Sequence, residues 1–311
     1  MRPVYVEAAA AVSPFGAGWR GLSRAPTGTG PSLSVPDLPT GSPKLRKMAS
    51  RGAELAAFVT QAVLEGVGDR SEIGFWLGVG ASGGSVAELE AMLAGSFEDD
   101  AFSLDRFAEH GLSQVNPLFA FQLMNNFTLC HAAILSGVGG PNGAFFSRGA
   151  GTVHALGEAM YAVQRGDCDR ALAGGADSAL HPVTRAELRR EGFVDSVLSE
   201  GAALLRLSAR ADAPLATVRE VRVVPAVDVG AVVDSARADL LVVAACDGRA
   251  RERLPRGGLD VSLALGDALA ATPALAWCAA LDALIDRGHG RALVLSLGGD
   301  GDLGVVLLER P

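Results

Sequence analysis

Short apolar runs that end near glycine alternate along this chain with longer segments whose apolar residues recur every three or four positions. Runs of the first kind predict buried strands, and segments of the second kind predict helices. The clearest strand covers residues 240–245, whose sequence LLVVAA contains no polar residue. Strands that alternate with helices are typical of folds in which helices cover a largely buried sheet. We therefore expect an α/β fold.

The expected elements form two sets with a similar order. The first set comprises strands at 3–12, 73–79, 143–146 and 170–173, helices at 44–66, 117–135 and 152–165, and a loop at 24–43. The second set comprises strands at 201–207, 215–224, 240–245, 292–297 and 304–309 and a helix at 268–285. Two such sets within 311 residues suggest an αβαβα sandwich of two related halves. We expect one domain over 1–311, with an N-terminal half at 1–208 and a shortened C-terminal half at 209–311.

The charge of the chain excludes several kinds of partner. It carries 35 acidic and 27 basic residues, a net charge of -8. Nucleic acid and anionic membrane surfaces are therefore poor partners. The same sign argues against direct docking of other acidic proteins.

Metal binding, cofactors and secretion are not indicated. The four cysteines are widely spaced and form no cluster with histidine, so we expect neither a metal site nor a disulfide framework. The first residues, MRPVYVEAAAAVSPFG, form an apolar run too short for a membrane helix and lack a signal-peptide cleavage pattern. We expect no cofactor and a cytoplasmic protein with reduced thiols.

Three runs in the chain carry a family resemblance. They are NPLFAFQLMNNFTLCHAAILSGVGGPNG at 116–143, GEAMYAVQRGDCDRALAGGADSALHP at 157–182 and EGFVDSVLSEGAALLRL at 191–207. In this order and spacing they resemble the β-ketoacyl synthase family, and the opening strand and the last hairpin fit its two ends. The resemblance implies a thiolase-like αβαβα sandwich, here with trimmed loops.

The resemblance also assigns positions for the family's chemistry. The family uses a cysteine at a strand-to-helix turn as acyl acceptor, and two histidines that hold the thioester oxygen and drive decarboxylation. Glycine stands at the cysteine position, Gly149, and the histidine positions fall on Cys246 and Asp267. Gly299 replaces a gating phenylalanine. Neither a thiol nor a carboxylate supplies a neutral imidazole donor, so the resemblance implies a subunit without catalytic residues.

Such a subunit resembles a chain length factor, the β subunit of a ketosynthase pair. The resemblance implies a heterodimer with an active ketosynthase in type II polyketide, polyene or fatty-acyl biosynthesis, in which this chain helps shape the acyl tunnel. The acyl carrier protein would then act on it only through the partner. Residues expected to line the tunnel or the interface are Phe119, Gln122, Leu123, Asn126, Phe145 and Phe146.

Two other functions stay open at this point. The chain could be an acyltransferase or hydrolase with a rewired site, using Cys246 or Ser147 as nucleophile. Ser147 lies in no GxSxG elbow, and Cys246 follows a buried strand, where a core thiol is the commoner role. The chain could also be a homodimer that holds an acyl chain.

Overall fold

A computed structural model describes residues 2–27, 32–36, 38, 48–81, 83–193, 197–225 and 229–311. Its strands form two five-stranded sets, each with the same order and the same directions. The first set runs β1(Tyr5–Ser13), β9(Leu198–Ser208), β8(Arg170–Ser178), β4(Gly74–Val79), β7(Asn142–Phe146). The second runs β10(Ala216–Pro225), β14(Asp302–Glu309), β13(Arg291–Leu297), β11(Leu240–Ala245), β12(Leu259–Asp260).

The two sets repeat each other strand for strand. In each, the first three strands are antiparallel neighbours, and the last two run parallel to the third. The sets join where Tyr5 and Val6 of β1 pair with Thr217 and Ala216 of β10, which makes one continuous twisted sheet. This repetition is the expected internal relation of two halves. Because β9 ends at Ser208, we propose the boundary between the halves at 208/209.

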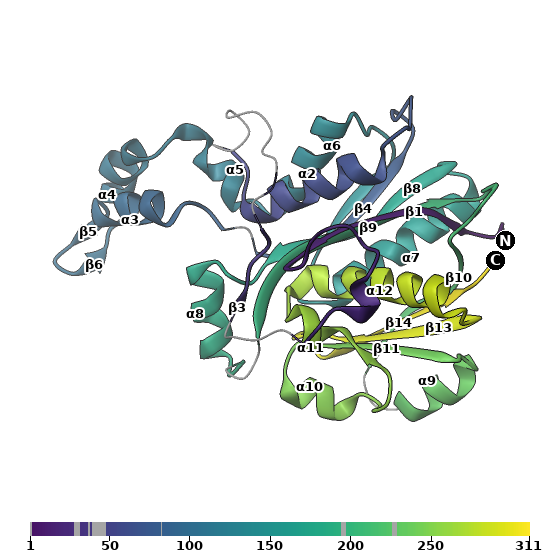
Figure 1. The fold of residues 1–311 in the computed structure, drawn as a ribbon. Coiled ribbons are helices and arrows are strands. Elements are labelled where there is room, and N and C mark those ends of the chain that lie inside the picture. The colour runs from purple at the N-terminus through teal and green to yellow at the C-terminus, as the bar shows by residue number, and fades with distance from the viewer. Residues whose placement is uncertain are drawn as a thin grey trace.

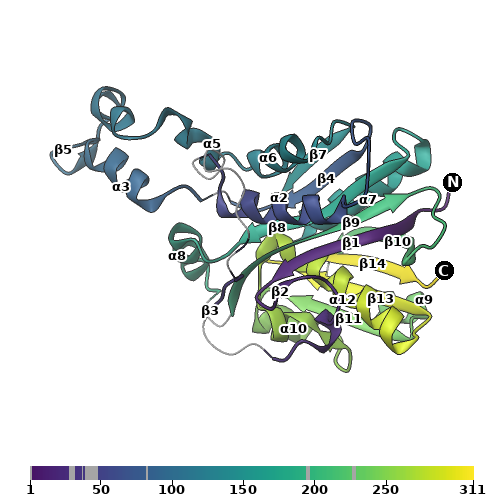
Figure 2. The same cartoon turned by 45° about the horizontal axis from the view of Figure 1, so that its top comes forward.

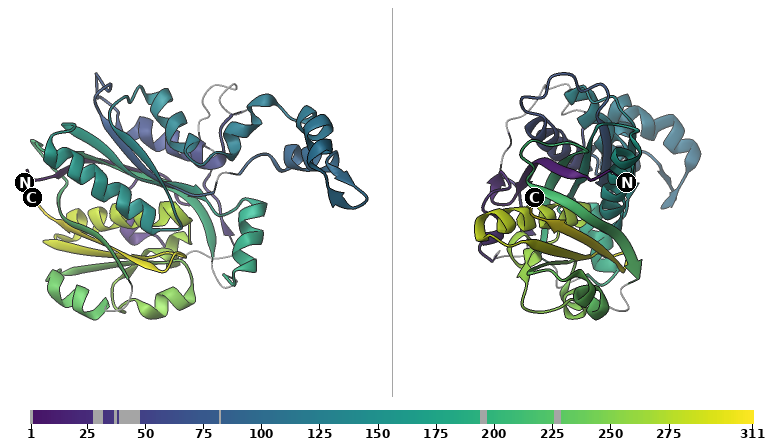
Figure 3. Two further views of the ribbon diagram at one scale, coloured as in Figure 1. Left: turned by 180° about the vertical axis from the view of Figure 1, so that it is seen from behind. Right: turned by 90° about the vertical axis from the view of Figure 1, so that its right-hand side faces the viewer.

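Helices fill the three remaining layers of the sandwich (Figure 1). Helices α2(Arg51–Val63) and α6(Phe127–Ser136) cover the outer face of the first set. Helices α7(Ala150–Arg165) and α12(Thr272–Arg287) lie between the two sets, and α9(Val229–Ala236) and α10(Gly248–Arg253) cover the outer face of the second. The predicted thiolase-like αβαβα sandwich is confirmed. The two chain ends lie at the same end of the molecule (Figure 3).

The central layer is built from small side chains. Alanines dominate the buried face of α7, and α12 buries every residue from Thr272 to Leu284. The segment Leu269–Arg287 is long and apolar enough to cross a membrane, but 89% of its apolar window is buried inside the structure, as in the core helix of a folded domain.

Most predicted elements are confirmed, with ends that shift by a few residues. The helix expected at 44–66 begins at Arg51, because the hydroxyl of Ser50 accepts a hydrogen bond from the Ala53 amide and caps it. Residues 39–47, which held the end of the expected loop and the start of that helix, lie outside the described residues. Helices α8(Pro182–Arg190), α9, α10 and the short α11(Val261–Leu265), strand β12 and the short pieces β2(Gly16–Ala17), β3(Ser32–Leu33) and η1(Leu22–Arg24) were not predicted, and neither were the elements between residues 86 and 114. The start of the helix predicted at 268–285 is the 3₁₀ turn η5(Leu269–Ala271).

The prediction of one long helix at 117–135 is wrong. The chain forms η4(Pro117–Phe119) and α5(Ala120–Leu123), leaves helical geometry at Met124, and restarts as α6 after a bend of 104°. Two adjacent asparagines, Asn125 and Asn126, occupy the break. Asparagine side chains compete with the backbone for hydrogen bonds, which disfavours a helix interior.

The predicted end of the strand at residue 173 is also wrong, since β8 continues to Ser178. The sequence GGADS follows the predicted strand, but its two glycines serve close packing within β8 rather than a turn. A Cβ atom on Gly174 would meet the carbonyl oxygen of Ala203, and one on Gly175 would meet that of Ala270. The glycines therefore let neighbouring backbone approach the strand.

One segment leaves the body of the molecule. Residues 85–118, here called the arm, contain α3(Val86–Ala94), the hairpin β5(Phe97–Glu98) and β6(Ala101–Phe102), α4(Leu104–Arg106) and the turns η2(Phe107–Gly111) and η3(Leu112–Gln114). The arm packs on itself and projects away from the sheet layers, as Figure 2 and Figure 3 both show. It returns to the body through η4 and α5.

Candidate functional site

The turn from β7 into α7 places Gly149 directly before the helix. Its backbone angles, φ 143° and ψ -65°, belong to a region that residues with side chains rarely adopt. A Cβ atom built there would lie 2.9 Å from the Cα and 3.3 Å from the amide nitrogen of Gly298. The last hairpin thus closes over the position where the family carries its nucleophile.

The structure brings together the three positions that the resemblance assigned to the chemistry. Gly149, Cys246 and Asp267 line one cavity, although they come from three different segments of the chain. The cavity measures about 10 Å³, which is the space of one water molecule. No histidine is among its described lining residues. Such a cavity cannot receive an acyl chain.

Side chains of the protein accept hydrogen bonds from the first backbone amides of α7. The Asp300 carboxylate accepts a hydrogen bond from the Ala150 amide at 2.9 Å, and the Ser147 hydroxyl accepts one from the Gly151 amide at 2.5 Å. The positive end of a helix is where an oxyanion would be stabilised. Here the Asp300 carboxylate lies at this position, and the Ser147 hydroxyl caps the helix.

Burial shifts the ionisation of the groups at this cavity. It raises the pKa of Asp267 to about 6, although the Thr272 hydroxyl and the Leu269 amide both donate to its Oδ1 at 2.9 Å. Burial also raises the pKa of Cys246 to about 12, and the neighbouring Asp267 carboxylate adds to the effect. A thiol is nucleophilic only as thiolate, so Cys246 stays protonated and inert near neutral pH.

A second buried carboxyl lies behind the cavity at the end of β8. Asp177 accepts hydrogen bonds from the amides of Ala270, at 3.2 Å, and Ser178, at 2.7 Å. Burial, followed by repulsion from Asp267, raises its pKa to about 7. Arg148, which lines the cavity, forms an ion pair with Glu191 and lowers both carboxyl pKa values only weakly. Within the described residues, no group of three or more His, Cys, Asp and Glu side chains is placed to hold a metal.

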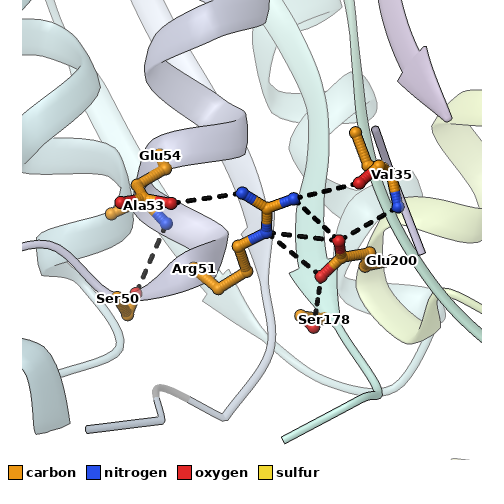
Figure 4. Close-up of polar contacts among 7 residues, drawn as sticks. All are labelled: Val35, Ser50, Arg51, Ala53, Glu54, Ser178 and Glu200. Carbon is orange, nitrogen blue, oxygen red and sulfur yellow. Dashed lines mark hydrogen bonds and ion pairs between the residues drawn. The ribbon is translucent and has the colours of Figure 1, made fainter. Parts of the chain in front are cut away.

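An ion pair between a half-buried arginine and a buried glutamate lies near this site (Figure 4). Arg51, at the start of α2, contacts both carboxylate oxygens of Glu200 on β9, the shortest distance being 2.8 Å. Ser178 and the Val35 amide donate to the same carboxylate at 2.9 and 3.1 Å. The pair ties an outer helix, two strands and the loop at Val35 together, which is a structural role.

The residues expected at the tunnel do not share one helix face, because the helix is broken. Phe119 is 2% exposed, and its ring packs where a Cβ on Gly84 would lie. Gln122 is buried and accepts a hydrogen bond from the Ser85 amide at 3.0 Å. Leu123 is exposed, and Asn126 lies in the break.

The strand β7 ends the sheet and leaves one edge unpaired within the described part of the chain. Its side chains alternate, so that Phe145 points inward and stacks on His154, while Phe146 is 62% exposed. On α6, Ile134 is 75% exposed. Of the two phenylalanines predicted for the interface, Phe146 is the more exposed, and Phe145 is half-buried.

Solved structures of ketosynthases share this fold. A type II polyketide synthase acyl-carrier protein in complex with its ketosynthase bound to the hexaketide aligns over 100% of both chains, with a TM-score of 0.79 and 12% identity. A β-ketoacyl synthase from Burkholderia phymatum aligns over 100% of both chains, with a TM-score of 0.78 and 15% identity. The ishigamide ketosynthase/chain length factor aligns over 99% of both, with a TM-score of 0.70 and 21% identity.

Similar sequences lead to the same group. The 3-oxoacyl-[acyl-carrier-protein] synthase 2 of Staphylococcus aureus is 29% identical over 116 residues, 37% of this chain and 25% of the relative. The match thus spans about a quarter of the relative's length. The family model of the β-ketoacyl synthase N-terminal domain matches residues 41–207, more than half of the chain. The chain therefore belongs to the β-ketoacyl synthase family.

Proposed function

We propose that this chain is a non-catalytic, chain-length-factor-like subunit that pairs with an active ketosynthase in type II polyketide, polyene or fatty-acyl biosynthesis. The observation that carries the proposal is the closed turn at Gly149. It has no side chain to acylate, no room for one, and a cavity of about 10 Å³ beside it. The Asp300 carboxylate at the start of α7 supports the same conclusion, because it repels a developing oxyanion.

The proposed contact with the ketosynthase runs along the free edge of β7 and the exposed residues of α6. An unpaired strand edge readily pairs with a strand of another chain. Phe146 and Ile134 add apolar surface beside that edge. The ishigamide ketosynthase/chain length factor, whose fold this chain shares, is by its name such a pair. An acyl carrier protein would reach this chain only through the ketosynthase.

The proposed tunnel role belongs to η4 and α5. Leu123 lies on their exposed side, and Phe119 lies buried against Gly84. If Leu123 closes the far end of the partner's tunnel, Leu123→Ala lengthens the products of the reconstituted pair. Phe119→Ala deepens the same end by removing the ring beneath it, at the cost of stability.

The test is to express the chain with candidate ketosynthases and to isolate the pair. Incubation with acyl- and malonyl-carrier protein, followed by intact-protein mass spectrometry, should place the acyl group on the ketosynthase. A covalent acyl adduct on this chain would show that it is catalytic. A chain that purifies alone as a well-behaved monomer, and binds none of the ketosynthases, would refute the pairing.

A further inference from the structure

The arm carries most of the net charge of the chain. Residues 85–118 contain seven acidic side chains and one basic one, Arg106, so the arm has a net charge of -6, against -8 for the whole chain. The acidic residues are Glu88, Glu90, Glu98, Asp99, Asp100, Asp105 and Glu109. Three of them are consecutive at the far end of the arm (Figure 1), where Glu98 ends β5 and Asp99 and Asp100 form the turn to β6.

The arm has no apolar core of its own. Of its residues, only Ser96 and Gly111 are buried, and α3 buries none. Six large apolar side chains of the arm are exposed, and they are Leu93, Phe97, Phe102, Leu104, Leu112 and Leu118. Ordering a residue costs roughly 1–2 kcal/mol of conformational entropy, which buried apolar area must offset. The arm therefore has the composition of a segment that a second surface covers.

Apolar and acidic groups meet at the tip of the arm. The rings of Phe97 and Phe102 pack edge to face with their centroids 6.1 Å apart, and the ring centroid of Phe107 lies 5.8 Å from that of Phe102. The acidic turn at 98–100 joins the two strands that carry the first pair. A surface that covers this tip has to offer an apolar patch and positive charge next to it.

We propose that the arm binds a basic surface with an apolar patch on a different protein. A second copy of this chain is a poor occupant, since the rest of the chain has a net charge of only -2 and offers no positive excess. The arm continues through α5 and α6 toward β7 (Figure 2). One partner can thus cover the arm and the strand edge together. That this partner is the ketosynthase rests on the proposed function.

The charge part of the proposal is tested in the isolated pair with a neutral tip. The variant Glu98→Gln, Asp99→Asn, Asp100→Asn removes three charges and keeps the turn, because asparagine tolerates the positive φ of residues 99 and 100. We expect association with the ketosynthase to slow about 10-fold in 50 mM NaCl and to match the unmodified chain in 500 mM NaCl.

A matched control removes three exposed charges from the body instead. The variant Glu65→Gln, Asp234→Asn, Glu252→Gln makes the same change in net charge and should leave the association rate unchanged. Equal rates for the tip variant and the control would overturn the role of the acidic tip, while the pair itself, and so the proposed function, would stand.

The apolar part has its own readout. Amide hydrogen exchange of the arm should be fast in the free chain and at least 10-fold slower in the pair. Phe102→Ser with Leu104→Ser should raise the dissociation rate and leave the circular dichroism of the chain intact. Unchanged exchange in a stable pair would refute the docking of the arm. Protection of the arm in a homodimer would refute a different protein as partner. Failure to bind any ketosynthase would instead count against the proposed function, and the partner assignment would fall with it.

Discussion

Replacing Asp267 by asparagine should stabilise the protein, and by more at high pH than at low pH. The carboxyl is 6% exposed, and burial raises its pKa from 3.8 to about 6. Between these two values the folded state holds a proton that the unfolded state has lost. The free energy of unfolding therefore carries no penalty from Asp267 below about pH 4. It falls as the pH rises from there through about 6, because the buried carboxyl then ionises.

The magnitude follows from the size of the shift. Two pKa units correspond to about 3 kcal/mol once the carboxyl is fully ionised, near pH 8. At pH 5, where the carboxyl is mostly protonated in the folded state, the same shift destabilises the protein by about 1.5 kcal/mol. Asparagine does not ionise, and its amide oxygen can still accept from the Leu269 amide and the Thr272 hydroxyl. The gain in free energy of unfolding should thus be about 1.5 kcal/mol larger at pH 8 than at pH 5.

Urea unfolding at pH 5 and pH 8, followed by circular dichroism at constant ionic strength, measures this difference. Asp234→Asn, an exposed carboxyl of α9, is the control and should give the same small effect at both values. Removing the Asp267 charge also lowers the pKa of Asp177, which acts in the same direction. A variant that loses equal stability at both pH values would refute the assignment of a strained, ionised carboxyl.

Three further predictions test the closed turn, the ion pair of Arg51 with Glu200 and the strand edge. Gly149→Cys should lower the free energy of unfolding by about 2 kcal/mol or more and give no condensation activity, because φ is 143° and the turn has no room for a Cβ; urea unfolding and a carrier-protein assay measure both. Arg51→Met should cost about 2 kcal/mol, because the buried Glu200 carboxylate loses its charge partner but keeps the hydrogen bonds from Ser178 and the Val35 amide, and adding Glu200→Gln should recover part of that loss in a double-mutant cycle. Phe146→Asp should abolish pairing but keep the fold, whereas Phe145→Asp should unfold the chain, which size-exclusion chromatography and circular dichroism distinguish.

The sequence predicts the sandwich well because burial leaves a strong periodic signal. Strand β11 lies at residues 240–245, as its apolar run predicted, and β13 differs by one residue. The break after Leu123 was missed, since an apolar run interrupted by two asparagines fits one helix or two. The extent of β8 was missed because glycine marks turns and close packing alike.

The candidate site, too, was predicted from the sequence only in part. Motif spacing was enough to bring Gly149, Cys246 and Asp267 to one place. It gave no sign that Asp300 would cap α7, because a local turn sequence does not reveal a contact across 150 residues. The pairing of Arg51 with Glu200 was likewise hidden, as each residue looks like an ordinary surface charge in its own segment.

The central place of β1 has a consequence for synthesis on the ribosome. This strand is made before its partners: β9 begins only at Leu198, and β10, which β1 also contacts, lies beyond that. The second set of strands is contiguous in the chain and closes on itself soon after it is made. Within the first set, β1 stays without that partner while the arm and the strands β4, β7 and β8 are made. Distant pairings of this kind slow folding and favour aggregation, so β1 is open to wrong partners until β9 has been synthesised.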